Sequence, residues 1–304
     1  MKISVIGAGM VGSTAAQRIA DNKLADEIVL VDVVDSVIGK ALDIQQSAPI
    51  EGFKAKVKGT MDYKDIKNSG IVIVTAGLPR QPGMSREDLL KKNAEITIHI
   101  SKNIKQYAPN SIIIVVTNPL DAMSYLTLKI TGFNKNKVIG MAGILDTARF
   151  RTFLAEELCV APIEVQALVL GSHGDTMVPV LEETKVKGKP ITQLLSKEKI
   201  AALVERTRNA GAEIVNYLKK GSAYYAPSSS VVQMVRAIVK DTKKILPCSV
   251  YVEGEYGYDG IFIGLPVKLG KNGVEEIVSI KLSESVKNQL DKSAEIIKKS
   301  CSEV

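Results

Sequence analysis

The stretch KISVIGAGMVGSTAAQ, residues 2–17, decides the fold class. A short apolar run, Ile3–Ile6, leads directly into the turn GAGMVG, and a segment of helical composition follows. In this GxGxxG pattern Gly7 permits a tight turn, Gly9 leaves room for a phosphate beside the backbone, and Gly12 lets the helix pack on the sheet. The stretch therefore predicts a strand, a phosphate-binding turn and a helix, which together open a dinucleotide-binding sheet.

An acidic residue ends the second predicted strand. Asp32 closes the run IVLVD, one helix further along the chain than Gly12. A carboxylate at this position accepts hydrogen bonds from both ribose hydroxyls and repels a 2′-phosphate, and no arginine follows to compensate. The sequence therefore favours NAD over NADP. The alternative is a glycine-rich turn without a ligand and a solvated Asp32.

Further apolar runs continue this pattern through the first half of the chain. Ile28–Val31, Ile71–Thr75 and Ile112–Thr117 stay apolar throughout instead of alternating, as parallel strands buried on both faces do. A helical pattern over residues 86–107 lies between two of them. We therefore expect an α/β fold, with a Rossmann doubly wound parallel sheet forming a dinucleotide-binding domain over residues 1–143.

The second half has a different order of elements. We expect a strand over residues 164–170, helices over 199–220 and 228–241, strands near 248–253, 261–269 and 274–280, and a closing helix over about 284–301. This order indicates a C-terminal α+β domain, which we place over residues 144–304 as the substrate domain. No low-complexity linker separates the halves, so they are expected to pack closely.

The composition excludes several classes of protein. The chain has 304 residues, of which 45% are hydrophobic and 24% charged, as in a soluble globular protein. Its longest strongly apolar run, Ile112–Val116, is far shorter than the ~20 residues of a membrane helix. A strand at residues 1–6 leads us to expect no targeting peptide before it. Three distant cysteines, Cys159, Cys248 and Cys301, argue against a disulfide framework and a metal site, and they favour a cytoplasmic location.

The net charge of +7 raises the question of a nucleic-acid partner. The lysines are scattered along predicted helices and mixed with acidic residues, and no basic stretch carries interleaved aromatic residues. We therefore expect no nucleic-acid binding and no membrane binding. A positive field would still help to attract an anionic ligand.

A loop rich in glycine and proline, AGLPRQPGMSRED, occupies residues 76–88. Its composition excludes a helix or strand until about Ser85, and it carries Arg80 and Arg86. Two arginines near the carboxyl ends of the strands suggest an anionic substrate and a loop that closes over it. The alternative is a surface loop with solvated arginines.

The motifs ILDTARFR and SHGD hold candidate acid–base chemistry. Asp146 and Arg149 lie three residues apart at the start of a helix and share one face, and His173 follows a strand. A carboxylate that orients an imidazole, beside an arginine that binds a carboxylate, suits hydride transfer to a 2-keto acid. The alternatives are a surface ion pair and a hydrogen-bonded histidine at a strand end. The other histidine, His99, lies in mid-helix and is expected to be structural.

Six motifs occur in the order found in the lactate/malate dehydrogenase superfamily: GAGMVG, VD at 31–32, AGLPRQPGMSR, VVTNPLD, LDTARFR and GSHGDTMVP. The chain resembles the malate dehydrogenases of the lactate-dehydrogenase-like type along essentially its whole length. The resemblance implies NAD-dependent, reversible hydride transfer between (S)-malate and oxaloacetate. The alternatives are a lactate or other 2-hydroxyacid dehydrogenase, an NAD-dependent glycoside hydrolase with a metal at Cys159 and His173, and a non-catalytic NAD-sensing module.

The resemblance also implies a role for each site residue. His173 is then the proton donor and acceptor, and Asp146 holds and stabilises it. Arg149 binds the C1 carboxylate bidentately, Arg86 polarises the carbonyl when the loop closes, and Asn118 lies near the substrate and the nicotinamide ribose. The residues expected to bind the cofactor are Gly7, Gly9, Met10, Val11, Gly12, Asp32, Thr75, Ala76, Gly77, Asn93, Val116 and Asn118.

Arg80 matches the loop position that discriminates between substrates in this superfamily. Members that act on malate have arginine there, and those that act on lactate have an uncharged residue. Gln81 is the next residue, so a shift of one position in the loop would favour lactate. The small Ala223 in GSAYYAPS adds support for a longer dicarboxylate. The family dimerises through the helices that contain residues 40–48 and 148–158, so we expect a homodimer or a homotetramer.

Overall fold

The computed structural model describes residues 1–78 and 85–304, and of Arg86 only the backbone. Its N-terminal half contains a six-stranded parallel sheet whose strands run in the order β3-β2-β1-β4-β5-β6. The strands are β1 (Lys2–Ile6), β2 (Glu27–Val31), β3 (Lys56–Thr60), β4 (Ile71–Val74), β5 (Ile112–Val115) and β6 (Val138–Gly140). This order confirms the predicted doubly wound sheet, in which strands are added outward in both directions from β1 and β4.

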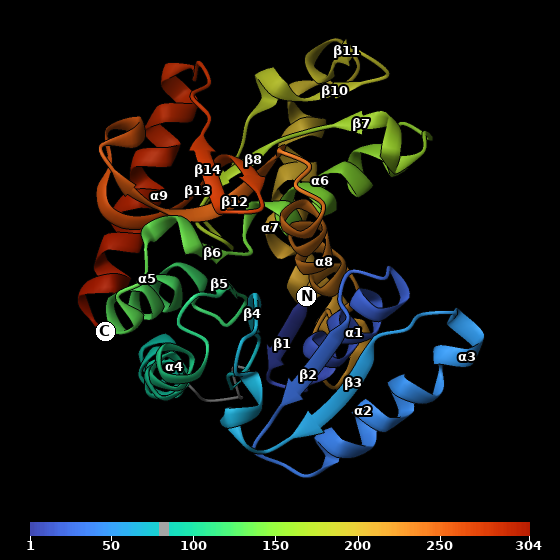
Figure 1. The fold of residues 1–304 in the computed structure, drawn as a ribbon. Helices are drawn as coiled ribbons and strands as arrows, with labels where there is room; N and C mark the ends of the chain where they lie inside the picture. The colour runs from blue at the N-terminus through green and yellow to red at the C-terminus, as the bar shows by residue number, and fades with distance from the viewer. Residues whose placement is uncertain (79–84) are drawn as a thin grey trace.

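Helices cover both faces of this parallel sheet (Figure 1). The chain moves from β1 to β3 in one direction and from β4 to β6 in the other, so right-handed crossovers place the two groups of helices on opposite faces. One group contains α1 (Met10–Asp21), α2 (Ser36–Gln46) and α3 (Ala48–Glu51), and the other contains α4 (Arg86–Tyr107) and α5 (Leu120–Thr131). The short 3-10 helices η1 (Tyr63–Ile66) and η2 (Lys135–Lys137) complete this half.

The C-terminal half continues the same sheet. β12 pairs antiparallel with β6 at Ser249 and Gly140, and the order runs on through β13, β8 and β9, with β14 beside β13. A separate three-stranded sheet has the order β11-β10-β7. The strands are β7 (Val165–Gln166), β8 (Val169–Gly171), β9 (Met177–Pro179), β10 (Lys185–Val186), β11 (Lys189–Pro190), β12 (Lys244–Glu253), β13 (Asp259–Gly270) and β14 (Gly273–Ile277).

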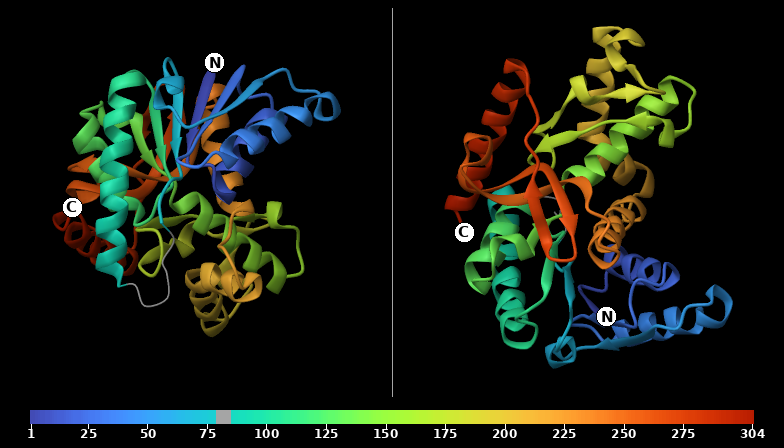
Figure 2. Two further views of the ribbon diagram at one scale, coloured as in Figure 1. Left: turned by 90° about the horizontal axis from the view of Figure 1, so that it is seen from below. Right: turned by 45° about the horizontal axis from the view of Figure 1, so that its top comes forward.

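Four long helices accompany these strands, and the half is α+β, as predicted. The helices are α6 (Gly143–Glu157), α7 (Lys197–Leu218), α8 (Tyr225–Val239) and α9 (Glu284–Ser302), with the short η3 (Pro162–Glu164), η4 (Leu181–Glu183), η5 (Ile191–Gln193) and η6 (Glu255–Gly257). Figure 2 shows the two halves from two further sides, and in both the C-terminal helix α9 lies far from α2. α8 packs directly against α1 (Figure 1), which joins the halves beside the glycine-rich turn.

The single strand predicted over residues 164–170 is wrong. The segment contains the end of η3 and then two strands, of which β7 belongs to the small sheet and β8 to the main sheet. β7 is only two residues long and includes the exposed Gln166, and β8 is three residues long, so the local sequence cannot reveal that the chain changes sheets between them. The helix predicted over 228–241 also begins earlier, at Tyr225, because Pro227 is accommodated in its first turn, where no hydrogen-bond donor is needed.

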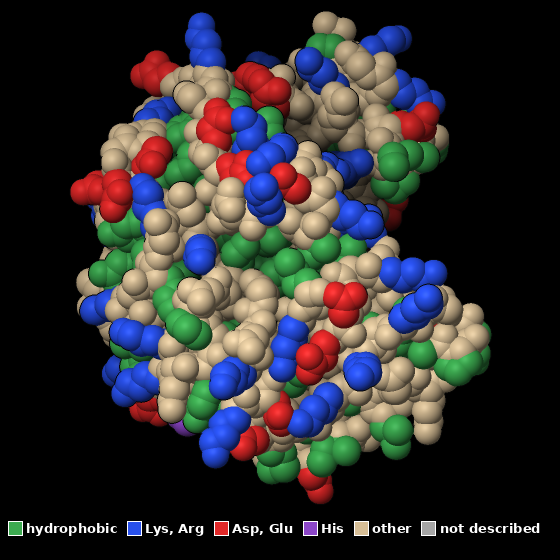
Figure 3. All heavy atoms as spheres, viewed as in Figure 1, with side chains coloured by type: hydrophobic (Ala, Val, Ile, Leu, Met, Phe, Trp, Pro, Cys, Tyr) green, Lys and Arg blue, Asp and Glu red, His purple; other side chains and the backbone are tan. Residues whose placement is uncertain are grey.

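Both halves contribute to one large hydrophobic core. It joins the side chains of the parallel strands to those of α8, α9, β12 and β13, while a smaller cluster lies between α6, α7 and the small sheet. Among the described residues, no helix is long and apolar enough to cross a membrane. On the face shown in Figure 3, Lys and Arg side chains are spread over both halves with Asp and Glu between them.

Candidate active site

A cavity of about 530 Å³ opens at the carboxyl ends of β1, β2 and β4. Six of the residues predicted to bind the cofactor line it: Gly7, Gly9, Asp32, Thr75, Ala76 and Gly77. They come from three separate turns that follow neighbouring parallel strands, and the carboxyl ends of such strands meet at one edge of the sheet. The cavity therefore lies where a dinucleotide binds in this class of sheet.

The three glycines of the turn have different surroundings, and each is explained differently. Gly7 has φ of +97°, and a Cβ there would lie 2.4 Å from the backbone nitrogen of Ala76. A Cβ on Gly12 would lie 1.9 Å from the carbonyl oxygen of Gly7, so only glycine lets α1 approach the turn this closely. A Cβ on Gly9 would meet no heavy atom within 4 Å, so this position is open. An open glycine at the N-terminus of α1 fits the approach of a pyrophosphate.

The Asp32 carboxylate is held by backbone donors. The N–H of Ala8 donates to Oδ2 at 2.6 Å, and the N–H of Val33 donates to Oδ1 at 2.7 Å. Each carboxylate oxygen keeps a second lone pair for a ribose hydroxyl. Lys40 on α2, which the sequence analysis missed, donates to the carbonyl oxygen of Ala8 at 2.5 Å and brings a positive charge to the same turn.

Aromatic and apolar side chains form the far wall of the cavity. Ile96, His99 and Ile100 reach it from α4, and Tyr63 reaches it from η1. The rings of Tyr63 and His99 meet edge to face, with 5.5 Å between their centroids. Burial and the charge of Asp32 raise the pKa of Tyr63 to about 12, so its phenol stays neutral. His99 is exposed on a cavity wall, where it packs against Tyr63, and its structural role stays a prediction.

Asn93 joins two of the turns at the edge of this cavity. Its Oδ1 accepts from the backbone N–H of Leu78 at 2.8 Å, and its Nδ2 donates to the carbonyl oxygen of Asn118 at 2.7 Å. The peptide bond between Asn118 and Pro119 is cis. The polar atoms of the buried Asn93 side chain are therefore engaged with the protein, and they fix the Asn118 backbone relative to the base of the loop.

The remaining predicted cofactor residues lie next to these turns. Met10 and Val11 open α1, and Val116 follows β5. The carbonyl oxygen of Val11 accepts a hydrogen bond from the buried hydroxyl of Ser228 at 2.8 Å. This bond ties α8 of the C-terminal half to the first turn of α1. Nothing in the local sequence of Ser228 signals it, because the two residues are brought together only by packing.

His173 and Asp146 form a hydrogen-bonded pair. Asp146 lies in the first turn of α6, where it is buried, and His173 lies in the turn between β8 and β9. The Nδ1 atom of His173 is 2.9 Å from Oδ2 of Asp146. Burial lowers the pKa of His173, but the charge and hydrogen bond of Asp146 outweigh burial and raise it above the usual value. Because Nδ1 is engaged, Nε2 is the nitrogen that can exchange a proton with a substrate.

Arg149 lies beside this pair, and its positive charge has no carboxylate at hydrogen-bond distance among the described residues. Its Nη1 is 3.8 Å from Oδ1 of Asp146, and its side chain is 13% exposed. Its Nε is buried and has no hydrogen-bond partner in the part of the chain that the structure describes. Burial lowers the pKa of the Arg149 guanidinium, against the charge of Asp146. A buried guanidinium with free donors favours a bound anion, above all a carboxylate.

Two predicted substrate residues belong to the loop that precedes α4. Arg80 lies outside the described residues, together with the rest of segment 79–84. Arg86 is the first residue of α4, and its side chain is likewise outside the description. The predictions that Arg80 selects the substrate and that Arg86 acts on closure of the loop therefore stay predictions.

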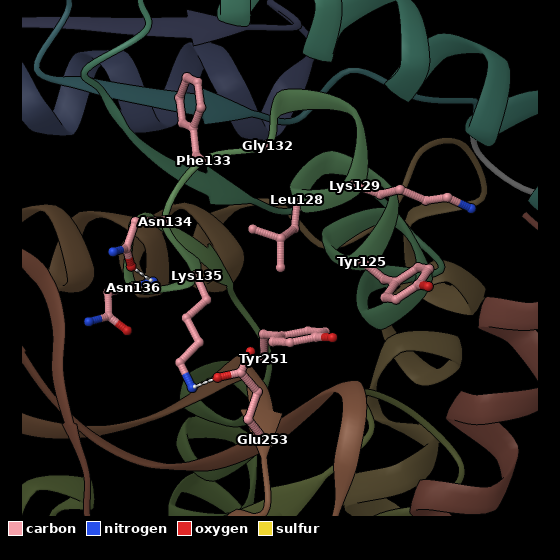
Figure 4. Close-up of a pocket in the computed structure, with 10 residues that line it drawn as sticks. All are labelled: Tyr125, Leu128, Lys129, Gly132, Phe133, Asn134, Lys135, Asn136, Tyr251 and Glu253. Carbon is pink, nitrogen blue, oxygen red and sulfur yellow. Dashed lines mark hydrogen bonds and ion pairs between the residues drawn. The ribbon is translucent and has the colours of Figure 1, made fainter.

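A second cavity, of about 620 Å³, lies at the end of α5 (Figure 4). Its lining includes Tyr125, Lys135, Tyr251 and Glu253, and none of the predicted site residues. The Nζ atom of Lys135 is 2.8 Å from a carboxylate oxygen of Glu253, so its charge is already paired. Within residues 1–78 and 85–304, no three His, Cys, Asp or Glu side chains gather as metal ligands would.

Known proteins resemble this chain over its full length. Residues 1–140 match the family described as lactate/malate dehydrogenase, NAD binding domain, and residues 144–304 match lactate/malate dehydrogenase, alpha/beta C-terminal domain. The malate dehydrogenase of Chlorobium limicola is 56% identical over 302 residues, which are 99% of this chain and 97% of that protein.

Solved structures give the same result. The malate dehydrogenase of Salinibacter ruber has a TM-score of 0.95 and 48% identity, with 100% of this chain and 97% of that chain covered. A lactate dehydrogenase of Cryptosporidium parvum, solved with lactic acid and the nicotinamide cofactor, has a TM-score of 0.95 and 41% identity, over 99% and 96% of the two chains. Both halves and their order thus match, and the resemblance of the six motifs is confirmed. The chain belongs to the lactate/malate dehydrogenase family, and its N-terminal half is the NAD-binding domain of that family.

Proposed function

We propose that the chain is an NAD-dependent malate dehydrogenase that interconverts (S)-malate and oxaloacetate. The observation that carries this proposal is the buried Arg149 guanidinium, with unused donors, beside the His173–Asp146 pair. The pair supplies a proton donor and acceptor, and Arg149 supplies a site for the carboxylate next to the reacting carbon. NAD, when bound at the carboxyl edge of the sheet, accepts or supplies the hydride.

His173 moves the proton in both directions. In the reduction of oxaloacetate the charged imidazole donates its Nε2 proton to the carbonyl oxygen as the hydride reaches the carbon. In the oxidation of malate the neutral imidazole takes the hydroxyl proton. The Nδ1–H of His173 donates a hydrogen bond to the carboxylate of Asp146, and this carboxylate stabilises the imidazolium that forms.

Three arginines would hold the dicarboxylate. Arg149 binds the C1 carboxylate with two parallel hydrogen bonds. Arg80 would neutralise the second carboxylate, and Arg86 would polarise the carbonyl. Asn118 donates a further hydrogen bond near the substrate, from a backbone position that Asn93 fixes.

A lactate dehydrogenase is the second candidate, because Gln81 follows Arg80 and because the Cryptosporidium parvum lactate dehydrogenase has the same fold. The two candidates differ at the loop. Pyruvate would leave Arg80 without a carboxylate to pair with, which costs about 4 kcal/mol, or roughly a thousandfold in kcat/KM. The second carboxylate of oxaloacetate would form an ion pair with Arg80.

The test compares NADH oxidation with oxaloacetate and with pyruvate. We expect the wild-type protein to prefer oxaloacetate, and Arg80→Gln to lower its activity on oxaloacetate by orders of magnitude and raise its activity on pyruvate. Gln81→Ala is the matched control, and its substrate ratio should stay at the wild-type value. An unchanged ratio in Arg80→Gln would remove Arg80 from this role. A change in Gln81→Ala alone would show that glutamine faces the substrate.

We also infer a homo-oligomer and a reducing compartment. Leu42 on α2 is exposed and lies within 40–48, one of the two segments (40–48 and 148–158) where the family is expected to dimerise. Ile38 on α2 and Ile50 on α3, on either side of that segment, are also exposed. The three cysteines are free, with Cys159 exposed and the other two buried, which supports a cytoplasmic location.

A further inference from the structure

Lys40 brings a positive charge without a carboxylate partner to the turn between β1 and α1. It lies on α2, it is exposed, and its Nζ atom donates to the carbonyl oxygen of Ala8 at 2.5 Å. Asp43, on the next turn of α2, has the spacing at which helical ion pairs form with Lys40. Among the described residues, however, no carboxylate forms an ion pair with Lys40, because its side chain extends to the turn instead.

The packing of α2 on β3 fixes the place from which this lysine reaches the turn. A Cβ on Gly59 of β3 would lie 2.3 Å from the carbonyl oxygen of Val37, so the helix and the strand are in close contact. The side chain of Val37 is fully buried, and Lys40 follows it by one helical turn. The backbone of Lys40 is therefore held firmly, while its ammonium group stays at the surface.

Asp32 and Lys40 are linked through a single residue, Ala8. The N–H of Ala8 donates to Oδ2 of Asp32 at 2.6 Å, and the carbonyl oxygen of Ala8 accepts from Lys40. Asp32 lines the nucleotide cavity, whereas Lys40 does not, so the ammonium group lies just outside the cavity. If the Asp32 carboxylate binds the ribose hydroxyls of NAD, this ammonium group is next to the ribose.

NAD and NADP would meet this pair of charges differently. The 2′-hydroxyl of NAD donates to a carboxylate, whereas the 2′-phosphate of NADP is negatively charged and is repelled by Asp32. A lysine ammonium is a point charge with three donors on a flexible stem, and it suits a phosphate. No arginine follows Asp32 in the sequence to compensate for a 2′-phosphate, but the fold brings a lysine to the same place.

We propose that Lys40 determines cofactor selectivity together with Asp32. Lys40 is the cation that would bind a 2′-phosphate, and the charge of Asp32 alone keeps the site selective for NAD. The proposal concerns only the cofactor, which follows from the family of residues 1–140. It is therefore independent of whether the substrate is malate or lactate.

The turn should keep its structure when Lys40 is replaced. The carbonyl oxygen of Ala8 also accepts a hydrogen bond from the hydroxyl of Ser13, at 2.9 Å. It therefore retains a donor when the ammonium group is removed. A charge effect of Lys40 on the ligand can thus be separated from an effect on the fold by comparing Kd with Tm.

Asp32→Asn and Lys40→Met, made singly and together, test the proposal through Kd for NADH and NADPH, followed by the emission of the reduced nicotinamide. Asparagine removes the charge of Asp32 and keeps an acceptor oxygen, and methionine removes the charge of Lys40 and keeps a long side chain. We expect Asp32→Asn to bind NADPH about tenfold more tightly than wild type. Adding Lys40→Met should weaken NADPH binding about tenfold, NADH binding less than about twofold, and leave Tm unchanged.

Lys292→Met is the matched control. It removes the same charge from an exposed lysine on α9, a helix that lies far from α2 (Figure 2). Combined with Asp32→Asn, it should leave both Kd values unchanged. Asp32→Ser replaces Asp32→Asn if that variant does not fold. The effect of Lys40→Met on NADPH should also shrink as the salt concentration rises, because exposed charges are screened.

The outcomes distinguish a ligand contact from a structural role. Equal losses of NADH and NADPH affinity on adding Lys40→Met, with a lower Tm, would show that Lys40 only supports the turn and would overturn the proposal. NADPH affinity that is the same with and without Lys40, or that does not rise in Asp32→Asn, would also overturn it. A selective loss of NADPH affinity in a protein that does not reduce oxaloacetate would support the role of Lys40 and refute the proposed function.

Discussion

At the scale of single residues, His173 governs the pH dependence of the proposed reaction. Its pKa lies above 6.5, because Asp146 outweighs the effect of burial. Reduction of oxaloacetate needs the charged imidazole, so it is retained at low pH and lost as pH rises through this raised pKa. Oxidation of malate needs the neutral imidazole, so it is gained as pH rises through the same value.

Asp146→Asn should move both limbs to lower pH, because it removes the charge and the carboxylate acceptor that raise the pKa of His173. His173→Asn should lose roughly 10²–10⁴-fold in turnover and keep its affinity for NADH. The measurements are kcat/KM against pH in both directions, and NADH titration by its own emission, which suits a chain without tryptophan.

The other histidine provides the control for that prediction. His99→Asn should leave both pH limbs in place, since His99 lies on the wall of the nucleotide cavity and away from Asp146. Turnover within tenfold of wild type in His173→Asn would mean that another group carries the proton. A displaced limb of the pH profile in His99→Asn would likewise mean that His173 is not the group that carries the proton.

The residues of the candidate site could be predicted from sequence only where they lie in a motif. His173, Asp146 and Arg149 stand out because their residue types and short spacings suggest chemistry before any fold is known. Ser228 and Val11 are 217 positions apart, and their contact exists only after α8 and α1 have packed.

At the scale of elements, the turn between β1 and α1 contains one glycine that the packing of the fold requires and one that leaves room for a ligand. Gly12 is required by packing, since a Cβ there would lie 1.9 Å from the carbonyl oxygen of Gly7. Gly9 is not: it has φ of −68°, which any residue adopts, and it borders open space. The open space is where a pyrophosphate would approach the backbone.

Two alanine substitutions should therefore have opposite effects. Gly12→Ala should destabilise the fold by about 1–3 kcal/mol, since α1 must move away from the turn. Gly9→Ala should keep the wild-type Tm and weaken NADH binding about tenfold or more, because its methyl group occupies the approach of the phosphates. Thermal unfolding and NADH titration measure the two effects. A wild-type Tm in Gly12→Ala, or wild-type NADH affinity in Gly9→Ala, would contradict these assignments.

Elements were predictable from sequence where they are long or buried on both faces. The parallel strands β1, β2, β4 and β5 have continuous apolar runs, and the pattern identifies all four. β3 was not identified, because the sequence KVKGT is mostly polar and has no continuous apolar run, as suits a strand at the edge of the sheet. β7 and β8 were predicted as a single strand, because only tertiary contacts determine which sheet each of them joins.

At the scale of the whole molecule, the two halves share a sheet and a core. β6 pairs with β12, and α8 packs on α1, where Ser228 bonds the carbonyl oxygen of Val11. The substrate groups on α6 and the β8–β9 turn are therefore fixed relative to the nucleotide cavity by regular structure. This arrangement suits hydride transfer, since a catalytic group displaced by about 1 Å can lose a hundredfold in rate.

The exposed apolar surface of α2 and α3 is the remaining feature at this scale. Leu42 is 56% exposed and lies within segment 40–48, which is expected to form the dimer, and Ile50, just after that segment, is 86% exposed. In a two-fold symmetric interface each substitution acts twice. Burying one leucine contributes about 1.5–3 kcal/mol, so Leu42→Glu should weaken dimerisation by roughly 10²–10⁴-fold in Kd.

Sedimentation velocity over a range of concentrations measures this. Wild type should sediment as a dimer or tetramer, and Leu42→Glu should sediment as a single chain at low micromolar concentration. Ile296→Glu is the matched control, because Ile296 is 49% exposed and belongs to α9, a helix that lies far from α2 (Figure 2). Its oligomeric state should equal that of wild type. A variant Leu42→Glu that keeps the wild-type assembly would place the interface elsewhere on the molecule, because a buried, unpaired carboxylate on each side of this face would not be tolerated.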